Sequence, residues 1–131
     1  MVEDNPGDIR LIQKAFEESP VGMRTVENGE DAIELLLEEA GGCASGVDLV
    51  LLDLKLPNKN GEEVLDEIRD EPRLNHVPVI ILTSSEDEDD VVEMYERGAN
   101  AYLTKPVSFE GFVKMAEEVE GFWLETAELP I

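Results

Sequence analysis

The chain has 131 residues, of which 42% are hydrophobic, and its formal net charge is −22 because 32 Asp and Glu stand against 10 Lys and Arg. This length and composition predict a single domain, residues 1–131, with a substantial core. So acidic a chain disfavours nucleic-acid binding through phosphate neutralisation. No apolar run approaches the ~18 residues of a transmembrane helix and the acidic N-terminus does not resemble a signal peptide, so we expect a cytoplasmic protein without membrane binding.

Helical and extended patterns alternate through the first half of the chain. The predicted elements are a helix that begins at Asn5-Pro6 and runs toward Ser19, a short strand 23–26, a helix 30–40 and a strand 47–53. The last of these lies in the stretch VDLVLLDLKLP, whose continuous apolar run is typical of a strand buried on both faces. It ends at Asp53, and an aspartate at the carboxyl end of such a strand lies where open α/β sheets bind their ligands.

The same alternation continues to the C-terminus. The predicted elements are a helix around 64–68 that Pro72 ends, a strand 79–83, a helix from about 86 to Gly98, a strand 101–104 and a helix 108–124. Ser85 and Glu88 have the spacing of a capping box at the start of the fourth helix.

This order of elements predicts a doubly wound α/β sandwich with a parallel sheet. Its first strand is truncated, because two residues precede Glu3 where a strand usually has about five. We favour the interpretation that the recorded start lies downstream of the true one, over a reorganised N-terminus.

Polar side chains follow the ends of several predicted strands: Glu3 and Asp4, then Asp53, Thr83 and Lys105. Converging carboxylates repel one another unless a cation neutralises them. The chain has one Cys and one His, so the oxygen ligands favour a hard ion, and Mg²⁺ fits best. An aspartate nucleophile, a metal, a lysine and a hydroxyl donor together are typical of phosphoryl transfer.

The chain resembles response-regulator receiver domains of two-component signalling over nearly its whole length. Four motifs carry the resemblance, in the family's order and spacing: VEDNPGD, VLLDLKLPNKNG, PVIILTSS and RGANAYLTKPV. It implies a flavodoxin-like, five-stranded sheet of order 2-1-3-4-5. It also implies a cis bond between Lys105 and Pro106.

The resemblance assigns a role to each polar residue. It makes Asp53 the phosphoacceptor, Glu3, Asp4, Asp53 and the backbone carbonyl of Lys55 the Mg²⁺ ligands, Thr83 the switch hydroxyl, Lys105 the phosphoryl contact and Tyr102 the aromatic switch. Tyr102 as simple packing at the sheet edge is the alternative.

A finer resemblance, to small stand-alone regulators of phytochrome-type sensor kinases, implies a sensor histidine kinase and a downstream protein as partners. A homodimer through the last strand and helix is a further expectation. Phe122, Trp123 and Leu124 would serve that contact or cover the core. We expect no DNA-binding output domain. The acidic composition favours a salt-rich, haloarchaeal cytoplasm over an unusually acidic mesophilic protein, since salt screens such self-repulsion.

Two other functions compete with the phosphorylation switch. One is a receiver-like binding module that is never phosphorylated. The other is a Mg²⁺-dependent phosphohydrolase of the haloacid-dehalogenase type. That class needs a general acid two residues after the nucleophile, where this chain has Lys55, which is poorly suited to the role at neutral pH. The expected protein is therefore a signalling phosphoacceptor and not an enzyme acting on other substrates.

Overall fold

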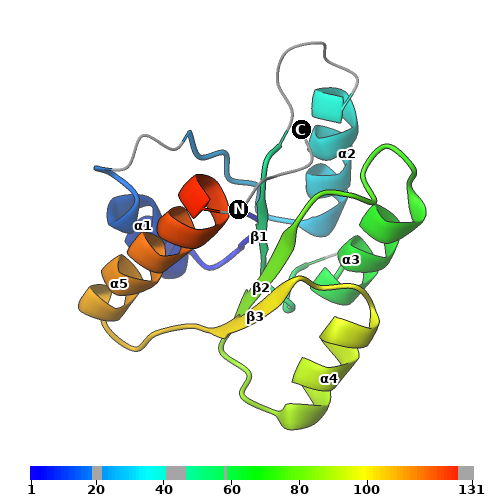
Figure 1. The fold of residues 1–131 in the computed structure, drawn as a ribbon. Helices are drawn as coiled ribbons and strands as arrows, with labels where there is room; N and C mark the ends of the chain where they lie inside the picture. The colour runs from blue at the N-terminus through cyan, green and yellow to red at the C-terminus, as the bar shows by residue number, and fades with distance from the viewer. Residues whose placement is uncertain (19–21, 41–46, 58, 127–131) are drawn as a thin grey trace.

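The computed structural model describes residues 1–18, 22–40, 47–57 and 59–126 (Figure 1). In chain order its elements are α1 (Pro6–Ala15), α2 (Gly29–Ala40), β1 (Val50–Leu52), α3 (Gly61–Asp70), β2 (Val79–Thr83), α4 (Glu88–Glu96), β3 (Ala101–Thr104) and α5 (Phe109–Val119), followed by a π-helical turn, Glu120–Thr126. No described helix is long and apolar enough to cross a bilayer.

The sheet has the predicted order, although its first two strands are each reduced to one bridging residue. β1, β2 and β3 pair in parallel in that order. Val2 forms parallel bridges to Val26 on one side and to Leu52 of β1 on the other. The N-terminal residues therefore occupy the central position of a 2-1-3-4-5 arrangement, and the predicted truncation of the first strand is confirmed.

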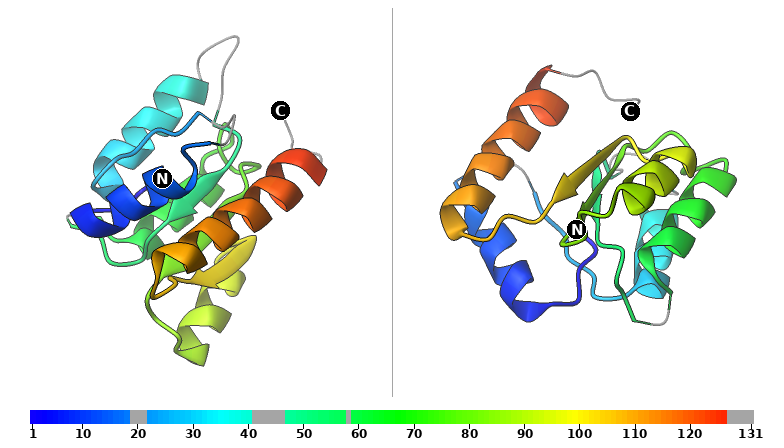
Figure 2. Two further views of the ribbon diagram at one scale, coloured as in Figure 1. Left: turned by 90° about the vertical axis from the view of Figure 1, so that its left-hand side faces the viewer. Right: turned by 90° about the horizontal axis from the view of Figure 1, so that it is seen from below.

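Both faces of the sheet are buried, which explains the continuous apolar runs. Val50, Leu52, Val79 and Ile81 face the α2–α3 side, whereas Leu51, Ile80 and Leu82 face the side of α1 and α5. The view from below shows the strands between these two helical layers (Figure 2). α4 packs beside β3.

Three helices begin with the same hydrogen bond. The side chains of Asn5, Asn28 and Asn60 each accept the backbone N–H of the acidic residue three positions later, at 3.0, 2.9 and 3.0 Å respectively. Such N-caps satisfy donors that the helix itself leaves unpaired. All three caps lie at the edge of the sheet where the strands end, and those of Asn5 and Asn60 follow the segments that carry Glu3, Asp4 and Asp53.

The predicted capping box at α4 is wrong. Asp87 is the N-cap, and its side chain accepts the N–H of Asp89 at 2.9 Å. Ser85 instead donates its hydroxyl to Asp90 at 2.6 Å. The segment DEDD supplies several capping acceptors in a row, and Asp87, whose own backbone is extended, is the one used.

The C-terminal helix is shorter than predicted, since α5 ends at Val119 and the chain widens into the π-helical turn. Trp123 packs against the core between α1 and α5. Phe122 is 56% exposed and meets the Trp123 ring edge-on. Trp123 thus covers the core, while Phe122 faces solvent.

Candidate functional site

Asp53 lies immediately after β1, at the carboxyl end of the sheet, and is only 6% exposed. Its backbone N–H donates to the carbonyl of Val2 at 3.0 Å, which ties it to the central N-terminal segment. The following loop folds back so that Gly61 donates its N–H to Leu54 at 2.9 Å. A Cβ at Gly61 would lie 2.2 Å from the Asp53 carbonyl oxygen, so only glycine permits this approach.

Two further carboxylates meet Asp53. Glu3, Asp4 and Asp53 each offer an oxygen, and these atoms all lie within 4.8 Å of one another. Glu3 is 1% exposed, whereas Asp4 faces solvent. A set of oxygen donors with one exposed member fits a hard divalent cation that keeps some of its water. The structure therefore brings together the three predicted side-chain metal ligands.

Lys105, after β3, provides the cation of the site. Its Nζ lies 2.7 Å from Oε2 of Glu3, 2.8 Å from Oδ2 of Asp8 and 3.2 Å from Oδ2 of Asp53. Its backbone N–H donates to the carbonyl of Thr83 at 2.7 Å, which fixes the end of β3 against the end of β2. The Lys105–Pro106 bond is trans, contrary to the expectation from the resemblance.

The charges of the site shift two pKa values. Burial raises the pKa of Glu3 to about 7; the charge of Asp53 acts in the same direction, and hydrogen bonds from Lys105 and Asn5 oppose it. For Lys105, burial lowers the pKa, but hydrogen bonds to Asp8 and Glu3 and the charge of Asp53 outweigh it and raise the pKa above its usual value. Lys105 therefore stays charged, and the Glu3 carboxyl group, with its raised pKa, takes up a proton at a higher pH than an ordinary glutamate does.

Thr83 and Tyr102 lie on neighbouring strands beside this cluster. Thr83 ends β2 and is 1% exposed. The Tyr102 hydroxyl donates to the backbone carbonyl of Ser85 at 2.9 Å. Partial burial, with the nearby negative charges of Asp90, Asp87 and Asp53, raises the pKa of Tyr102. This hydrogen bond joins β3 to the segment that follows Thr83. A movement of that segment would therefore displace the Tyr102 side chain or break the hydrogen bond.

Two further residues lie next to Asp53 and Lys105. Lys55 is exposed, and its backbone N–H lies 3.4 Å from Oδ1 of Asp53; its carbonyl as a metal ligand stays a prediction. Asp8 was not predicted as a site residue at all. Its position in the first turn of α1 suggests only a helix-terminal charge, and its partner Lys105 lies 97 positions along the chain, which no local pattern reveals.

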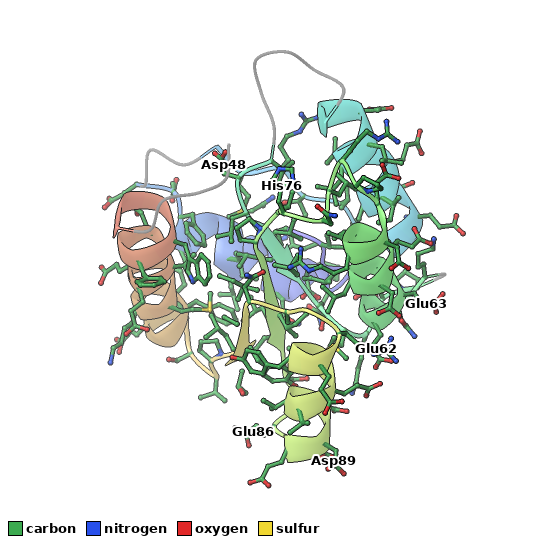
Figure 3. The ribbon with its side chains drawn as sticks, turned by 45° about the vertical axis from the view of Figure 1, so that its right-hand side comes forward. Asp48, Glu62, Glu63, His76, Glu86 and Asp89 are labelled. Atoms are coloured by element: carbon green, nitrogen blue, oxygen red, sulfur yellow. The ribbon has the colours of Figure 1, made fainter. Side chains whose placement is uncertain are left out.

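Some other polar side chains lie away from this site. His76 and Asp48 are exposed and precede β2 and β1, at the opposite edge of the sheet from Asp53 (Figure 3). Cys43 lies outside the described residues.

Sequence comparisons point to one family. The model of the response regulator receiver domain matches residues 1–117. The response regulator Rcp1 of Synechocystis sp. is 41% identical over 133 aligned positions, covering 99% of this chain and 90% of Rcp1. The probable methanogenesis regulatory protein FilR2 of Methanothrix harundinacea is 40% identical, covering 95% of this chain and 81% of FilR2.

Solved structures agree with this. The phosphorylated cyanobacterial phytochrome response regulator RcpA superposes with a TM-score of 0.90 at 44% identity, over 99% of this chain and 95% of that one. The Mn²⁺-bound form of Rcp1 superposes with a TM-score of 0.85 at 40% identity, over 99% and 96% of the two chains.

Proposed function

The chain belongs to the response-regulator receiver domains, and on this premise we propose that Asp53 accepts a phosphoryl group and thereby switches the partners of the protein. The observation that carries the proposal is the position of its carboxylate, which is buried beside Glu3 and Asp4 and lies 3.2 Å from the Lys105 ammonium. A nucleophile, a cation and a metal-binding set of oxygens are thus combined at one strand end.

In the proposed reaction an Oδ of Asp53 attacks the phosphorus of a phosphohistidine on a sensor histidine kinase. The P–N bond breaks and the imidazole nitrogen keeps the electron pair, leaving an aspartyl phosphate. Lys105 pairs with one phosphoryl oxygen and Thr83 donates its hydroxyl to another. The Lys105 ammonium already lies 3.2 Å from Asp53, so charge neutralisation does most of the catalysis.

Mg²⁺ is the proposed ion, held by Glu3, Asp4, Asp53 and the carbonyl of Lys55. The all-oxygen donors and the solvent-facing Asp4 support Mg²⁺ over a softer metal. When bound, it would supply positive charge to the carboxylates and to the phosphoryl oxygens.

The output follows from the contact between Tyr102 and Ser85. A phosphoryl group adds ≈ −1.5 to −2 charges, which would draw Thr83 and the segment behind it inward. Since Tyr102 donates to Ser85, this movement would also shift Tyr102 and change the surface of β3 and α5. This is a local charge event that biases a two-state element.

Names of similar proteins support the choice of partners. RcpA is a phytochrome response regulator, and we propose a sensor histidine kinase of that kind here, acting on a cytoplasmic single-domain regulator. We further propose that the signal passes to a downstream protein or through a homodimer at β3 and α5. The half-exposed Phe122 supports the dimer.

Incubation with acetyl phosphate and Mg²⁺ tests the central proposal, with intact mass as the readout. We expect one added phosphoryl group on the wild type and none on Asp53→Asn. No modification of the wild type would favour the binding module, and turnover of many unrelated phosphate esters would favour a hydrolase.

Light scattering over a range of concentrations tests the dimer. We expect a larger mass for wild type than for Phe122→Ala, and a smaller effect of Trp123→Ala, because Trp123 packs against the core. Equal monomer masses for all three proteins would contradict the dimer.

A further inference from the structure

Asp8, which was not among the predicted site residues, contacts Lys105. It is the third residue of α1, and its backbone N–H donates to the cap side chain of Asn5 at 3.0 Å. Its Oδ2 lies 2.8 Å from Nζ of Lys105, closer than the 3.2 Å between Nζ and Asp53. The rigid, capped start of the helix thus holds a carboxylate against the lysine.

With Asp8 as the third acceptor, all N–H donors of the Lys105 ammonium are occupied. An ammonium group has three N–H bonds, and Glu3, Asp8 and Asp53 supply three carboxylate acceptors within 3.2 Å. A phosphoryl oxygen on Asp53 therefore has to share a donor or displace an acceptor. Asp8 is not in the cluster of Glu3, Asp4 and Asp53 that fits a metal, so a bound cation there would leave its charge beside Lys105 in place.

We propose that Asp8 is a positioning residue that holds the Lys105 ammonium on the α1 side of the site and so restrains phosphoryl acceptance by Asp53. The inference rests on the proposed function. Two consequences of the Asp8 charge act in the same direction. It engages the lysine that the incoming phosphoryl group needs, and it adds negative charge where an anionic donor must approach. The same charge offsets that of Lys105 and thereby favours binding of a divalent cation nearby.

A purely structural role for Asp8 is the competing explanation, since an acidic residue in a first helical turn stabilises the helix. The chain offers a matched control for it. Asp31 is the third residue of α2, and its backbone N–H donates to Asn28 at 2.9 Å, as that of Asp8 does to Asn5. Asp31 is exposed and its described side-chain partner is Asn28.

The experiment measures two quantities for wild type, Asp8→Asn, Asp8→Glu and Asp31→Asn. One is the rate of phosphorylation by acetyl phosphate at saturating Mg²⁺, in which an Oδ of Asp53 attacks phosphorus and acetate leaves with the electron pair. The other is the Mg²⁺ concentration for half-maximal rate. For Asp8→Asn we expect a rate about three- to tenfold higher and a half-saturating Mg²⁺ concentration higher by a similar factor. Asp8→Glu and Asp31→Asn should stay near wild type in both.

These opposite changes in rate and in metal affinity separate positioning from loss of structure, which would lower both. An Asp8→Asn rate equal to or below wild type, with normal thermal unfolding, contradicts the inference. So does an equal increase in Asp31→Asn. A wild-type protein that takes no phosphoryl group contradicts the proposed function itself, and the inference falls with it.

Discussion

Lys105 is the residue on which the charge balance of the site depends. Its side chain is 10% exposed, and those of Glu3 and Asp53 are 2% and 7% exposed. Carboxylates so far from solvent repel each other and lose hydration, and a single ammonium compensates them. Its partners come from the N-terminal segment, from α1 and from the end of β1, so it also joins parts of the chain far apart in sequence.

Replacing Lys105 by Met should destabilise the metal-free protein by about 3–5 kcal/mol, because two buried carboxylates lose their counterion. Mg²⁺ should restore much of this stability, since it neutralises the same oxygens. Urea unfolding with and without Mg²⁺ measures both. Lys114→Met, which removes an equal charge from an exposed position, is the control. Equal losses in the two variants would contradict a special role of Lys105.

Gly61 is the second residue on which the site depends, because its backbone lies directly against the backbone of Asp53 and Leu54. Gly61→Ala should lower the acceptance rate of Asp53 and destabilise the fold, since the new methyl group meets the Asp53 carbonyl oxygen at 2.2 Å. Phosphorylation by acetyl phosphate and urea unfolding are the measurements. Gly7→Ala, whose Cβ would meet only the Asn5 side chain, at 3.2 Å, should cost clearly less.

At the scale of elements, a second network organises the opposite edge of the sheet. Arg69, in the last turn of α3, donates to the carbonyls of Gly98, Val77 and Asn75 at 2.9, 2.8 and 3.1 Å. It also donates to the side chain of Asn100 at 2.8 Å, and that side chain accepts the N–H of Val79 at 2.8 Å. One guanidinium therefore ties α3 to the segments that lead into β2 and β3.

Arg69→Leu should lower the free energy of unfolding by about 2–4 kcal/mol, because several carbonyls lose their donor at once. Arg97→Leu is the matched control. Arg97 makes partly exposed ion pairs with Glu93 and Asp66, and ion pairs that water can reach contribute little, so its loss should be clearly smaller. Chemical denaturation gives both values. A larger effect of Arg97 would contradict this assignment.

At the scale of the whole molecule, the acidic surface is the dominant property. The net charge is −22, and exposed acids lie on different parts of the molecule, among them Glu63 on α3, Glu86 before α4 and Asp89 on α4 (Figure 3). Such a distribution destabilises the compact state through self-repulsion, which salt screens over a Debye length of about 10 Å at 0.1 M.

The unfolding midpoint should therefore rise as KCl increases from about 0.1 to about 2 M. A variant with Asp48→Asn, Glu63→Gln and Glu86→Gln should be more stable at low salt and show a shallower dependence, because part of the repulsion is gone. Thermal unfolding across the salt series measures both slopes. If the unfolding midpoints of the two proteins rose equally with KCl concentration, screening of surface repulsion would not be the cause of the rise.

The sequence by itself determined the element order, the bounds of β2 and β3, and the convergence of Glu3, Asp53, Thr83 and Lys105. Buried parallel strands leave continuous apolar runs, and their carboxyl ends share one edge of the sheet. Only the tertiary structure decided the rest. It placed Val2 between Val26 and Leu52, chose Asp87 as the cap of α4 and set Asp8 against Lys105. The Val2 bridges and the Asp8–Lys105 contact join segments that are distant in sequence, and the cap of α4 is chosen among several similar acceptors. Neither kind of feature produces a hydrophobic periodicity that can be recognised in the sequence.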